Sequence, residues 1–438
     1  MRLQLYQEAV YILIFVFLVG CSSHITNVTS SAGVRYQRSP DYVIYYSDGT
    51  GIFESNTTTI DKLIFRYPSN TRGFQWEVSP DSKKIAFSLV DNDFEETTLS
   101  ILDLISLKSW QIKKIPKGLH FSFKWSPDSK ELAVAYASFT DNKYRLEYRS
   151  GVADIFITSS VDSTVKSIGC NVSKSVNHWL TNNILVVGDG NFLYGVNRQN
   201  CSTLFSLNMI DKTKITFSPD GTMIFYFTNV PVYKESGGKI DMTELYLANY
   251  DGKQPKKIIG YRYDPHHASW SPDGTKIVCD VRSLEWTDVR HIAIYDLVAG
   301  KASFSTEEND WGIPISEKPF WSPDGTKLLY DQTYELLYGR SAYETFYDNT
   351  YQTGSNSYFV LHKTLRNLLT NQKEVILEGS IHQNNLLTQA VGETVFWIDK
   401  QNILFGSAQW YKIYNILTKS VYTFSPDKHP ILIKQLSK

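Results

Sequence analysis

The chain has 438 residues, and its 44 lysines and arginines nearly balance 45 aspartates and glutamates, which leaves a formal net charge of -1 at pH 7. This balance argues against DNA binding, because nucleic-acid-binding proteins carry a strong excess of positive charge. Aromatic residues make up 14% of the chain, a content that suits packed β-sheets and a large core.

Residues 1–21 have the pattern of a bacterial lipoprotein signal peptide. Ala9 to Gly20 is an apolar run, too short for the roughly 20 residues that span a bilayer but suitable for the apolar region of a signal peptide. Leu18 to Cys21 matches a lipobox, in which Cys21 is lipidated and becomes the new N-terminus. Ser22 after it favours sorting to the outer membrane. The alternative is a buried apolar strand that ends in an ordinary cysteine.

Residues 22–37, which include Ser, Thr, Asn, Gly and Val, lack a sustained apolar pattern, so we expect a flexible tether. Residues 38–438 are expected to form one domain. The predicted location is the cell envelope, with a lipid anchor in the outer membrane, and the sequence leaves open whether the domain faces the periplasm or the cell surface.

One heptapeptide, Trp-Ser-Pro-Asp-Gly-Thr-Lys, stands intact at Trp270 to Lys276 and at Trp321 to Lys327. The order Ser, Pro, Asp, Gly suits a type I turn, because Pro presets φ, Asp can bond its own backbone and Gly tolerates a positive φ. Short apolar runs with a period of two flank each copy. Each copy therefore predicts a strand, a tight turn and a second strand.

Variants of this heptapeptide recur along the domain. They follow six anchor residues, and two eroded copies add two more anchors at Trp179 and Trp397, which makes eight units. By subtraction the spacings run from 38 to 54 residues, with a last one of 76, and most lie near the 40–50 residues of a four-stranded propeller blade. The six anchors are Arg38, Val78, Trp125, Phe217, Trp270 and Trp321.

The repeat resembles that of the TolB-like, WD-type bacterial β-propellers, whose blades carry this turn between their first and second strands. The resemblance covers about residues 38–428 and implies an all-β propeller of four-stranded blades. We favour eight blades, and seven is the alternative if the first unit is only partial. A spare strand at 430–433 is predicted to complete the first blade, because a ring of blades must join its two ends.

Long insertions between second and third strands occur at 137–151, 230–242, 282–290 and 334–357. The topology implied by the resemblance gathers these insertions on one face and the Ser-Pro-Asp turns on the other. Exposed tyrosine and tryptophan favour protein or carbohydrate recognition. The alternative is that the longest insertion buries its tyrosines over its own blade. The candidate partner-binding residues are Tyr334, Tyr338, Tyr343, Phe346, Tyr347, Tyr351, Trp286 and Tyr233.

Three cysteines remain beside Cys21. Cys170 and Cys201 flank the eroded unit at Trp179, and a bridge between them would stabilise that unit by about 3–4 kcal/mol. Two separate buried thiols are the alternative. Cys279 lies in an alternating strand and should be buried and inert.

No nucleophile elbow, zinc-protease motif, phosphate-binding loop or dinucleotide fingerprint is present in the sequence. Several histidines precede the anchor tryptophans and are expected near the mouth of the central channel, where they could bind a metal or act as acid and base. No ligand spacing supports a metal, so we expect neither a metal nor a cofactor. The candidate channel-mouth residues are Asp264, His266, His267, His178 and His120.

Three functional readings compete. We favour a non-catalytic, lipid-anchored envelope propeller that binds a protein or a glycan, without nucleic acid. The second reading is an enzyme that acts on polysaccharide or oligosaccharide, as some related propellers are lyases. A cluster of histidine with arginine or glutamine at the channel mouth, together with a bound metal, would favour it. The third is the propeller part of a peptidase system, but no hydrolase domain follows within the sequence.

The lipobox yields a first prediction. Replacing Cys21 by Ser removes the acyl acceptor, so the protein should leave the membrane fraction, because stable anchoring needs at least two acyl chains. Labelling with palmitate and sedimentation of membranes measure this, with Ser23→Ala as the control. A Cys21→Ser protein that still carries label and sediments with membranes would contradict the prediction.

Overall fold

The computed structural model describes residues 42–56, 61–91, 96–116, 119–142, 145–148, 154–160, 164–168, 175–188, 191–209, 212–233, 239–282, 290–304, 315–337, 357–382, 393–407, 410–424 and 429–435. Contacts divide the chain into residues 1–35 and residues 36–438, and every described residue belongs to the second unit. Among the described residues, no helix has the length and apolar character to cross a membrane.

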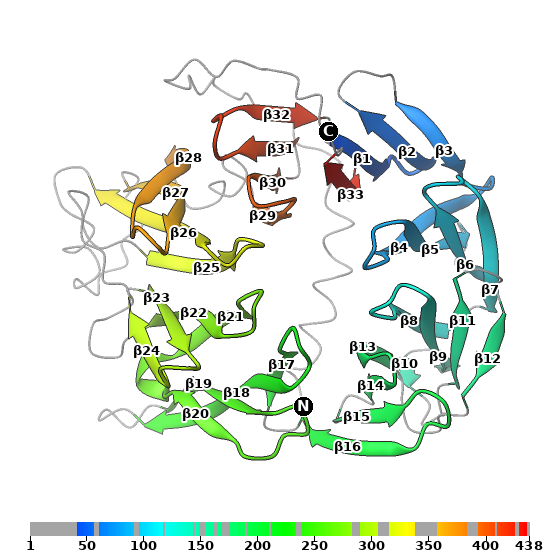
Figure 1. Cartoon of the computed structure of the whole chain (residues 1–438), viewed down its shortest axis with the longest axis horizontal. Coiled ribbons are helices and arrows are strands. Elements are labelled where there is room, and N and C mark those ends of the chain that lie inside the picture. Colours follow the sequence, from blue (N-terminus) through cyan, green and yellow to red (C-terminus); the bar gives the residue numbers. More distant parts are fainter. Residues whose placement is uncertain are drawn as a thin grey trace. The chain divides into compact units, whose positions relative to one another are not determined.

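The described strands pair into eight antiparallel sheets that follow one another around an axis (Figure 1). One of them, the closing sheet, combines the last strand with the first three. The first four sheets are β33 (His429–Gln435), β1 (Tyr42–Ser47), β2 (Gly51–Asn56) and β3 (Lys62–Arg66); β4 (Thr71–Val78), β5 (Lys84–Asp91), β6 (Glu96–Asp103) and β7 (Ser109–Pro116); β8 (Leu119–Trp125), β9 (Glu131–Asn142), β10 (Arg145–Tyr148), β11 (Asp154–Ser159) and β12 (Val165–Ser167); and β13 (Ser175–Thr181), β14 (Ile184–Gly188), β15 (Phe192–Asn197) and β16 (Thr203–Asn208).

The other four sheets follow the same order of pairing, and a short 3-10 helix, η1 (Tyr261–Tyr263), links two of them. They are β17 (Thr213–Phe217), β18 (Met223–Tyr233), β19 (Lys239–Asn249) and β20 (Lys256–Ile259); β21 (Pro265–Trp270), β22 (Lys276–Arg282), β23 (Arg290–Asp296) and β24 (Lys301–Phe304); β25 (Ile315–Trp321), β26 (Lys327–Leu337), β27 (Ser357–Asn367) and β28 (Lys373–His382); and β29 (Glu393–Trp397), β30 (Asn402–Ser407), β31 (Trp410–Asn415) and β32 (Val421–Phe424).

The repeated heptapeptide forms the turn between the first two strands of a sheet, as predicted. Ser271 Oγ donates to Asp273 Oδ1 at 2.6 Å and accepts from the backbone N–H of Lys276 at 2.9 Å. Gly274 N–H donates to the carbonyl of Ser271 at 2.9 Å, and Gly274 has a φ of 70°, a value that costs glycine little. The same bonds recur in the turns that begin at Ser79, Ser126, Ser218 and Ser322.

The anchor tryptophan links its sheet to the preceding one. The indole Nε1 of Trp125 donates to the backbone carbonyl of Glu77 at 3.0 Å, and Glu77 stands one residue before the preceding anchor. The equivalent bonds are Trp270 to Thr216 at 3.2 Å and Trp321 to Ser269 at 3.3 Å. In the two eroded copies, the indole nitrogens of Trp179 and Trp397 are buried and have no hydrogen-bond partner. These two units therefore keep the buried tryptophan but lack its hydrogen bond to the preceding sheet.

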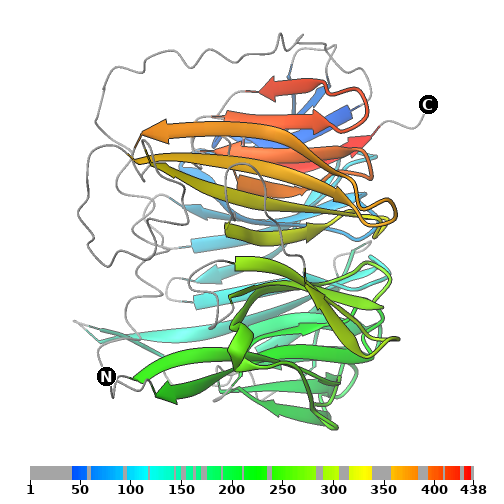
Figure 2. The ribbon, with the colours of Figure 1, turned by 90° about the vertical axis from the view of Figure 1, so that its left-hand side faces the viewer.

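The core lies between the sheets rather than at the axis, and neighbouring sheets stack face to face (Figure 2). Each apolar cluster joins residues of two consecutive sheets. The closing sheet takes part in two clusters, through Ile44 and Tyr46 against Leu404 on one side, and through Val43 against Phe87 on the other. These two clusters close the ring, which a sheet with two apolar faces requires.

The closing strand was predicted at 430–433, and the structure confirms it as β33. Ile433 stands opposite Ile44, and Gln435 at the end of β33 stands opposite Tyr42 at the start of β1. The β-propeller fold and its four-stranded blades are therefore confirmed. The first anchor, Arg38, lies outside the described residues.

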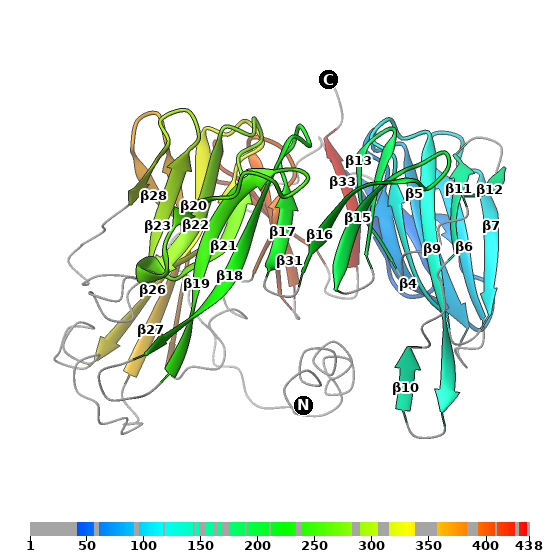
Figure 3. The same cartoon turned by 90° about the horizontal axis from the view of Figure 1, so that it is seen from below.

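The two faces of the ring differ. The Ser-Pro-Asp turns and the turns between third and fourth strands lie on one side, the turn face. The strand pairs β9–β10, β18–β19 and β26–β27 project on the other side, the hairpin face (Figure 3). The sequence predicted insertions here, but not that both ends of each insertion continue the strand ladder: the β26–β27 ladder reaches Leu337 opposite Ser357.

Two cysteines are described. Cys201 is disulfide-bonded, and Cys279 is a free, fully buried thiol whose pKa burial raises well above its usual value. The prediction for Cys279 is confirmed. Ile168, close to Cys170 in sequence, packs in the same apolar cluster as Cys201. Because Cys170 lies outside the described residues, its pairing with Cys201 remains a prediction.

The closing strand yields a second prediction. Deleting residues 429–438 removes every backbone bond between β33 and β1 and leaves that edge of β1, with Ile44 and Tyr46, without its neighbouring strand. The melting temperature should therefore fall by roughly 5 °C or more. Differential scanning calorimetry measures this, and deletion of residues 436–438 alone is the control. An unchanged melting temperature after the longer deletion would show that the ring closes in another way.

The indole links yield a third prediction, in which one substitution is compared at two sites. Trp125→Phe removes both volume and a hydrogen bond, whereas Trp397→Phe removes volume alone, because its indole nitrogen has no partner. The free energy of unfolding should therefore fall by about 1 kcal/mol more for Trp125→Phe. Denaturation by urea measures both values, and equal losses would show that the indole bond contributes nothing.

Candidate functional site

A group of charged side chains converges where β21 begins, on the side of the sheets from which the hairpins project. We call it the charged cluster. It joins the predicted residues Asp264, His266 and His267 to four residues that the sequence did not single out. The full set is Asp264, His266, His267, Asp280, Arg282, Arg290 and Glu317.

Asp264 is the first centre of the charged cluster. It follows η1 in a left-handed conformation, with a φ of 34°, and it is almost fully buried. Its Oδ1 accepts a hydrogen bond from the backbone N–H of Thr243 at 2.9 Å. Arg282 Nη2 donates to Asp264 Oδ2 at 2.9 Å, and His266 Nε2 lies 3.2 Å from the same oxygen. Burial would raise the pKa of Asp264, but the bonds from His266 and Thr243 outweigh burial and hold that pKa well below its usual range.

Asp280 is the second centre, and it is completely buried in β22. His267 Nδ1 lies 2.8 Å from Asp280 Oδ1, and Arg290 Nη1 donates to Asp280 Oδ2 at 2.8 Å. The first of these contacts is a hydrogen bond from His267 to the carboxylate in the tautomer that carries the proton on Nδ1. Arg290 Nε also lies 3.0 Å from Glu317 Oε1 on β25, so the cluster reaches the next sheet.

A bulge in β21 places His267. The register of β21 against β22 shifts between His266 and Ser269, and His267 adopts a φ of 43°. The residue three positions before the anchor is left-handed in the two flanking sheets as well: φ is 53° at Lys214 and 51° at Lys318. All three side chains are exposed. Such strained residues tend to occur at functional sites.

The side chains of the charged cluster differ in their exposure to solvent. Asp264 and Asp280 lie inside and are bonded to cations, while Glu317, both histidines and both arginines remain partly exposed. The outward surface therefore presents N–H donors of the histidines and arginines beside the Glu317 carboxylate, an arrangement that suits a polar ligand such as a sugar hydroxyl. Within the described ranges, no group of three or more His, Cys, Asp or Glu side chains could hold a metal ion.

The other predicted site residues fall elsewhere or outside the described part. The ring of His178 stacks on Phe217 at 5.4 Å, away from the charged cluster. His120 stands opposite Ala137, and Tyr334 stands opposite Val360 in β26. Tyr233 ends β18 and is 72% exposed. The remaining candidates lie outside the described residues: Tyr338, Tyr343, Phe346, Tyr347, Tyr351 and Trp286.

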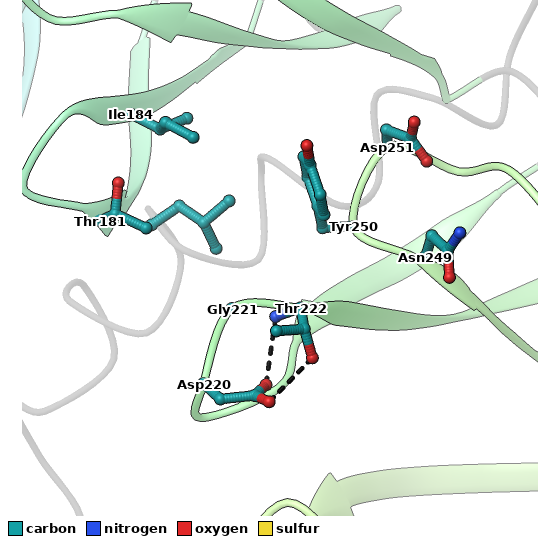
Figure 4. Close-up of a pocket in the computed structure, with 9 residues that line it drawn as sticks. Thr181, Ile184, Asp220, Gly221, Thr222, Asn249, Tyr250 and Asp251 are labelled. Atoms are coloured by element: carbon teal, nitrogen blue, oxygen red, sulfur yellow. Dashed lines mark hydrogen bonds between the residues drawn. The ribbon is translucent and has the colours of Figure 1, made fainter.

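A hollow of about 350 Å³ lies on the turn face between the β13–β16 and β17–β20 sheets (Figure 4). Asp220 and Asp251 are its carboxylates, and both are already bonded within their own turns, Asp220 to Thr222 and Asp251 to Lys253. Figure 4 shows the carboxylate of Asp220 directed back at Thr222. The hollow thus offers few free polar groups to a ligand.

The comparisons with known proteins support the fold and identify no family. No family model matches the sequence, and no curated relative matches it. The structure is similar to that of a eukaryotic initiation factor, which is 11% identical, with 91% of this chain and 98% of that chain covered and a TM-score of 0.51.

Two further solved structures match less closely. TolB from Acinetobacter baumannii is 15% identical over 76% of this chain and 62% of that chain, with a TM-score of 0.30. An oligogalacturonate lyase in complex with manganese is 13% identical over 91% of this chain and 98% of that chain, with a TM-score of 0.43. At such identities the likeness concerns the fold, and the chain is a β-propeller.

Proposed function

We propose that the protein is a non-catalytic binding scaffold of the cell envelope, lipid-anchored through Cys21, whose hairpin face binds a protein or glycan partner. The observation that carries this proposal is the charged cluster, which lies on the face from which the strand pairs project. Its partly exposed donors and the exposed Tyr233, which ends β18 on the same face, are the polar and aromatic groups typical of recognition surfaces.

The pairing within the charged cluster supports binding over acid–base catalysis. A general acid or base works best with a pKa near the working pH. The pKa of Asp264 is held below its usual range, and Asp280 is buried between His267 and Arg290. Asp264 in such surroundings positions His266 and Arg282 for a ligand and does not exchange protons readily with it.

One observation favours the second reading, an enzyme that acts on acidic polysaccharide or oligosaccharide. His266 and His267 lie beside Arg282 and Arg290, which is the histidine and arginine part of the combination expected for it, without the metal. The two readings separate in one assay. Incubation with acidic oligosaccharides should leave them intact for a scaffold, whereas the ultraviolet absorbance of an unsaturated uronate product would establish a lyase.

A fourth prediction tests the binding face by crosslinking in intact cells. A photoreactive residue at Tyr233, on the hairpin face, should capture a partner, and the same residue at Tyr250, on the turn face, serves as the matched control. Replacing residues 338–356 with a short Gly-Ser link should leave the fold intact and reduce capture at least tenfold, because aromatic anchors contribute about 2 kcal/mol or more each.

Two results would contradict this proposal. The shortened protein could fail to fold, which would show that the tyrosines of the insertion belong to the core. It could also fold and capture the same partner with unchanged yield, which would show that the insertion at 338–356 takes no part in binding.

A further inference from the structure

The turns between third and fourth strands carry an unexpected set of exposed aliphatic side chains on the turn face, which we call the apolar tips. They are strongly solvent-exposed: Val298 is 89%, Leu369 81%, Ile105 72% and Leu417 65% exposed. Single exposed apolar residues are ordinary on protein surfaces. Here, however, the same position of the same turn carries one in four sheets.

The turn geometry holds these side chains outward. An Asp or Asn two residues before the tip accepts backbone N–H groups of the turn: Asp103 Oδ1 accepts from Ile105 and Ser106, and Asn415 Oδ1 accepts from Leu417 and Thr418. The residue just before the tip is apolar too, and in these two turns it is buried, as Leu104 and Ile416. These two turns therefore bury one aliphatic side chain and expose the next, while Leu297 and Leu368 before the other two tips are half-buried.

The apolar tips are not spread evenly around the ring. Three of them stand on consecutive sheets, β21–β24, β25–β28 and β29–β32, and the fourth stands on the β4–β7 sheet, just beyond the closing sheet. The equivalent positions on the β13–β16 and β17–β20 sheets are polar, Gln199 and Asp251. Gln199 occupies the same kind of turn, since its N–H donates to Asn197 Oδ1. One arc of the turn face is apolar and another is not.

Two features point to what this arc contacts. An exposed lysine follows each tip within four residues: Lys108, Lys301, Lys373 and Lys419. The closing sheet, which lies within the arc, is also where the N-terminal segment joins the ring on the turn face, because Tyr42 pairs with Gln435 at the end of β33. The 21 residues from Cys21 to Tyr42 can span at most about 70 Å.

We propose that the apolar tips dock the turn face on a phospholipid bilayer surface, with the aliphatic side chains among the headgroups and the lysines beside anionic lipids. Well-separated aliphatic anchors with adjacent cations suit a bilayer interface. A protein partner would instead favour a contiguous patch with aromatic residues at its centre. The proposal extends the proposed lipid anchor, and it directs the hairpin face away from the membrane.

The fifth prediction uses the chain from residue 22 onward, which lacks both the acyl chain and the apolar run at 9–20. Vesicles are supplied in excess, because we expect the apolar tips alone to bind too weakly to keep the protein in the membrane fraction of cells. Its binding to vesicles of phosphatidylethanolamine and phosphatidylglycerol should weaken about tenfold or more in the variant Val298→Ser, Leu369→Ser, Leu417→Ser. The control, Leu204→Ser, removes a half-exposed leucine of β16 and should bind as before. Co-sedimentation with vesicles measures both, and equal binding of the triple variant would overturn the proposal.

A second readout locates the contact. An environment-sensitive dye on Leu417→Cys should shift to shorter emission wavelength with vesicles, and the same dye on Gln199→Cys should not. Shifts at both positions or at neither would overturn the proposal. So would a dimer in gel filtration that the triple variant converts to a monomer, because the tips would then join two copies of the chain. The triple variant should still capture a partner through position 233, so this test and that of the proposed function fail independently.

Discussion

Each sheet of this protein has two apolar faces, and it can bury them only against its two neighbours. The ring therefore has to close, and the closing sheet does this by pairing β33 with β1 and by packing Ile44 on one neighbour and Val43 on the other. The rest of the structure depends on this constraint. Because the core lies between the sheets, the loops at both faces are free of core packing and can vary in length and chemistry.

The fold could be predicted because its information is local. Ser271, Asp273 and Gly274 form their turn through bonds that span five residues at most, and the same letters recur at the spacing of a blade. The closure of the ring could be predicted because one spare strand, at 430–433, remained once strands had been assigned to the other blades. The roles of the anchor tryptophans could not be predicted, because the acceptor of Trp125 is a carbonyl about fifty residues away that no side-chain pattern marks.

The candidate site could be predicted only in part. Asp264, His266 and His267 stand together in the sequence, whereas their partners come from other strands. Asp280 interrupts the buried run Ile277 to Val281, and a carboxylate at such a position requires a cation nearby. That was the available signal, but the register that brings Arg290 to it is decided by pairing across strands.

The indole links have a consequence for the charged cluster. Two of them tie together the three sheets from β17 to β28, and the bonds from Thr243 to Asp264 and from Arg290 to Glu317 cross the same two boundaries. The cluster thus draws all its residues from an arc of the ring in which hydrogen bonds or ion pairs cross both boundaries between sheets. Its side chains are ordered before any ligand arrives, so a bound molecule loses little affinity to the ordering of the protein. Selectivity there would come from a preorganised shape and charge rather than from adaptation to the ligand.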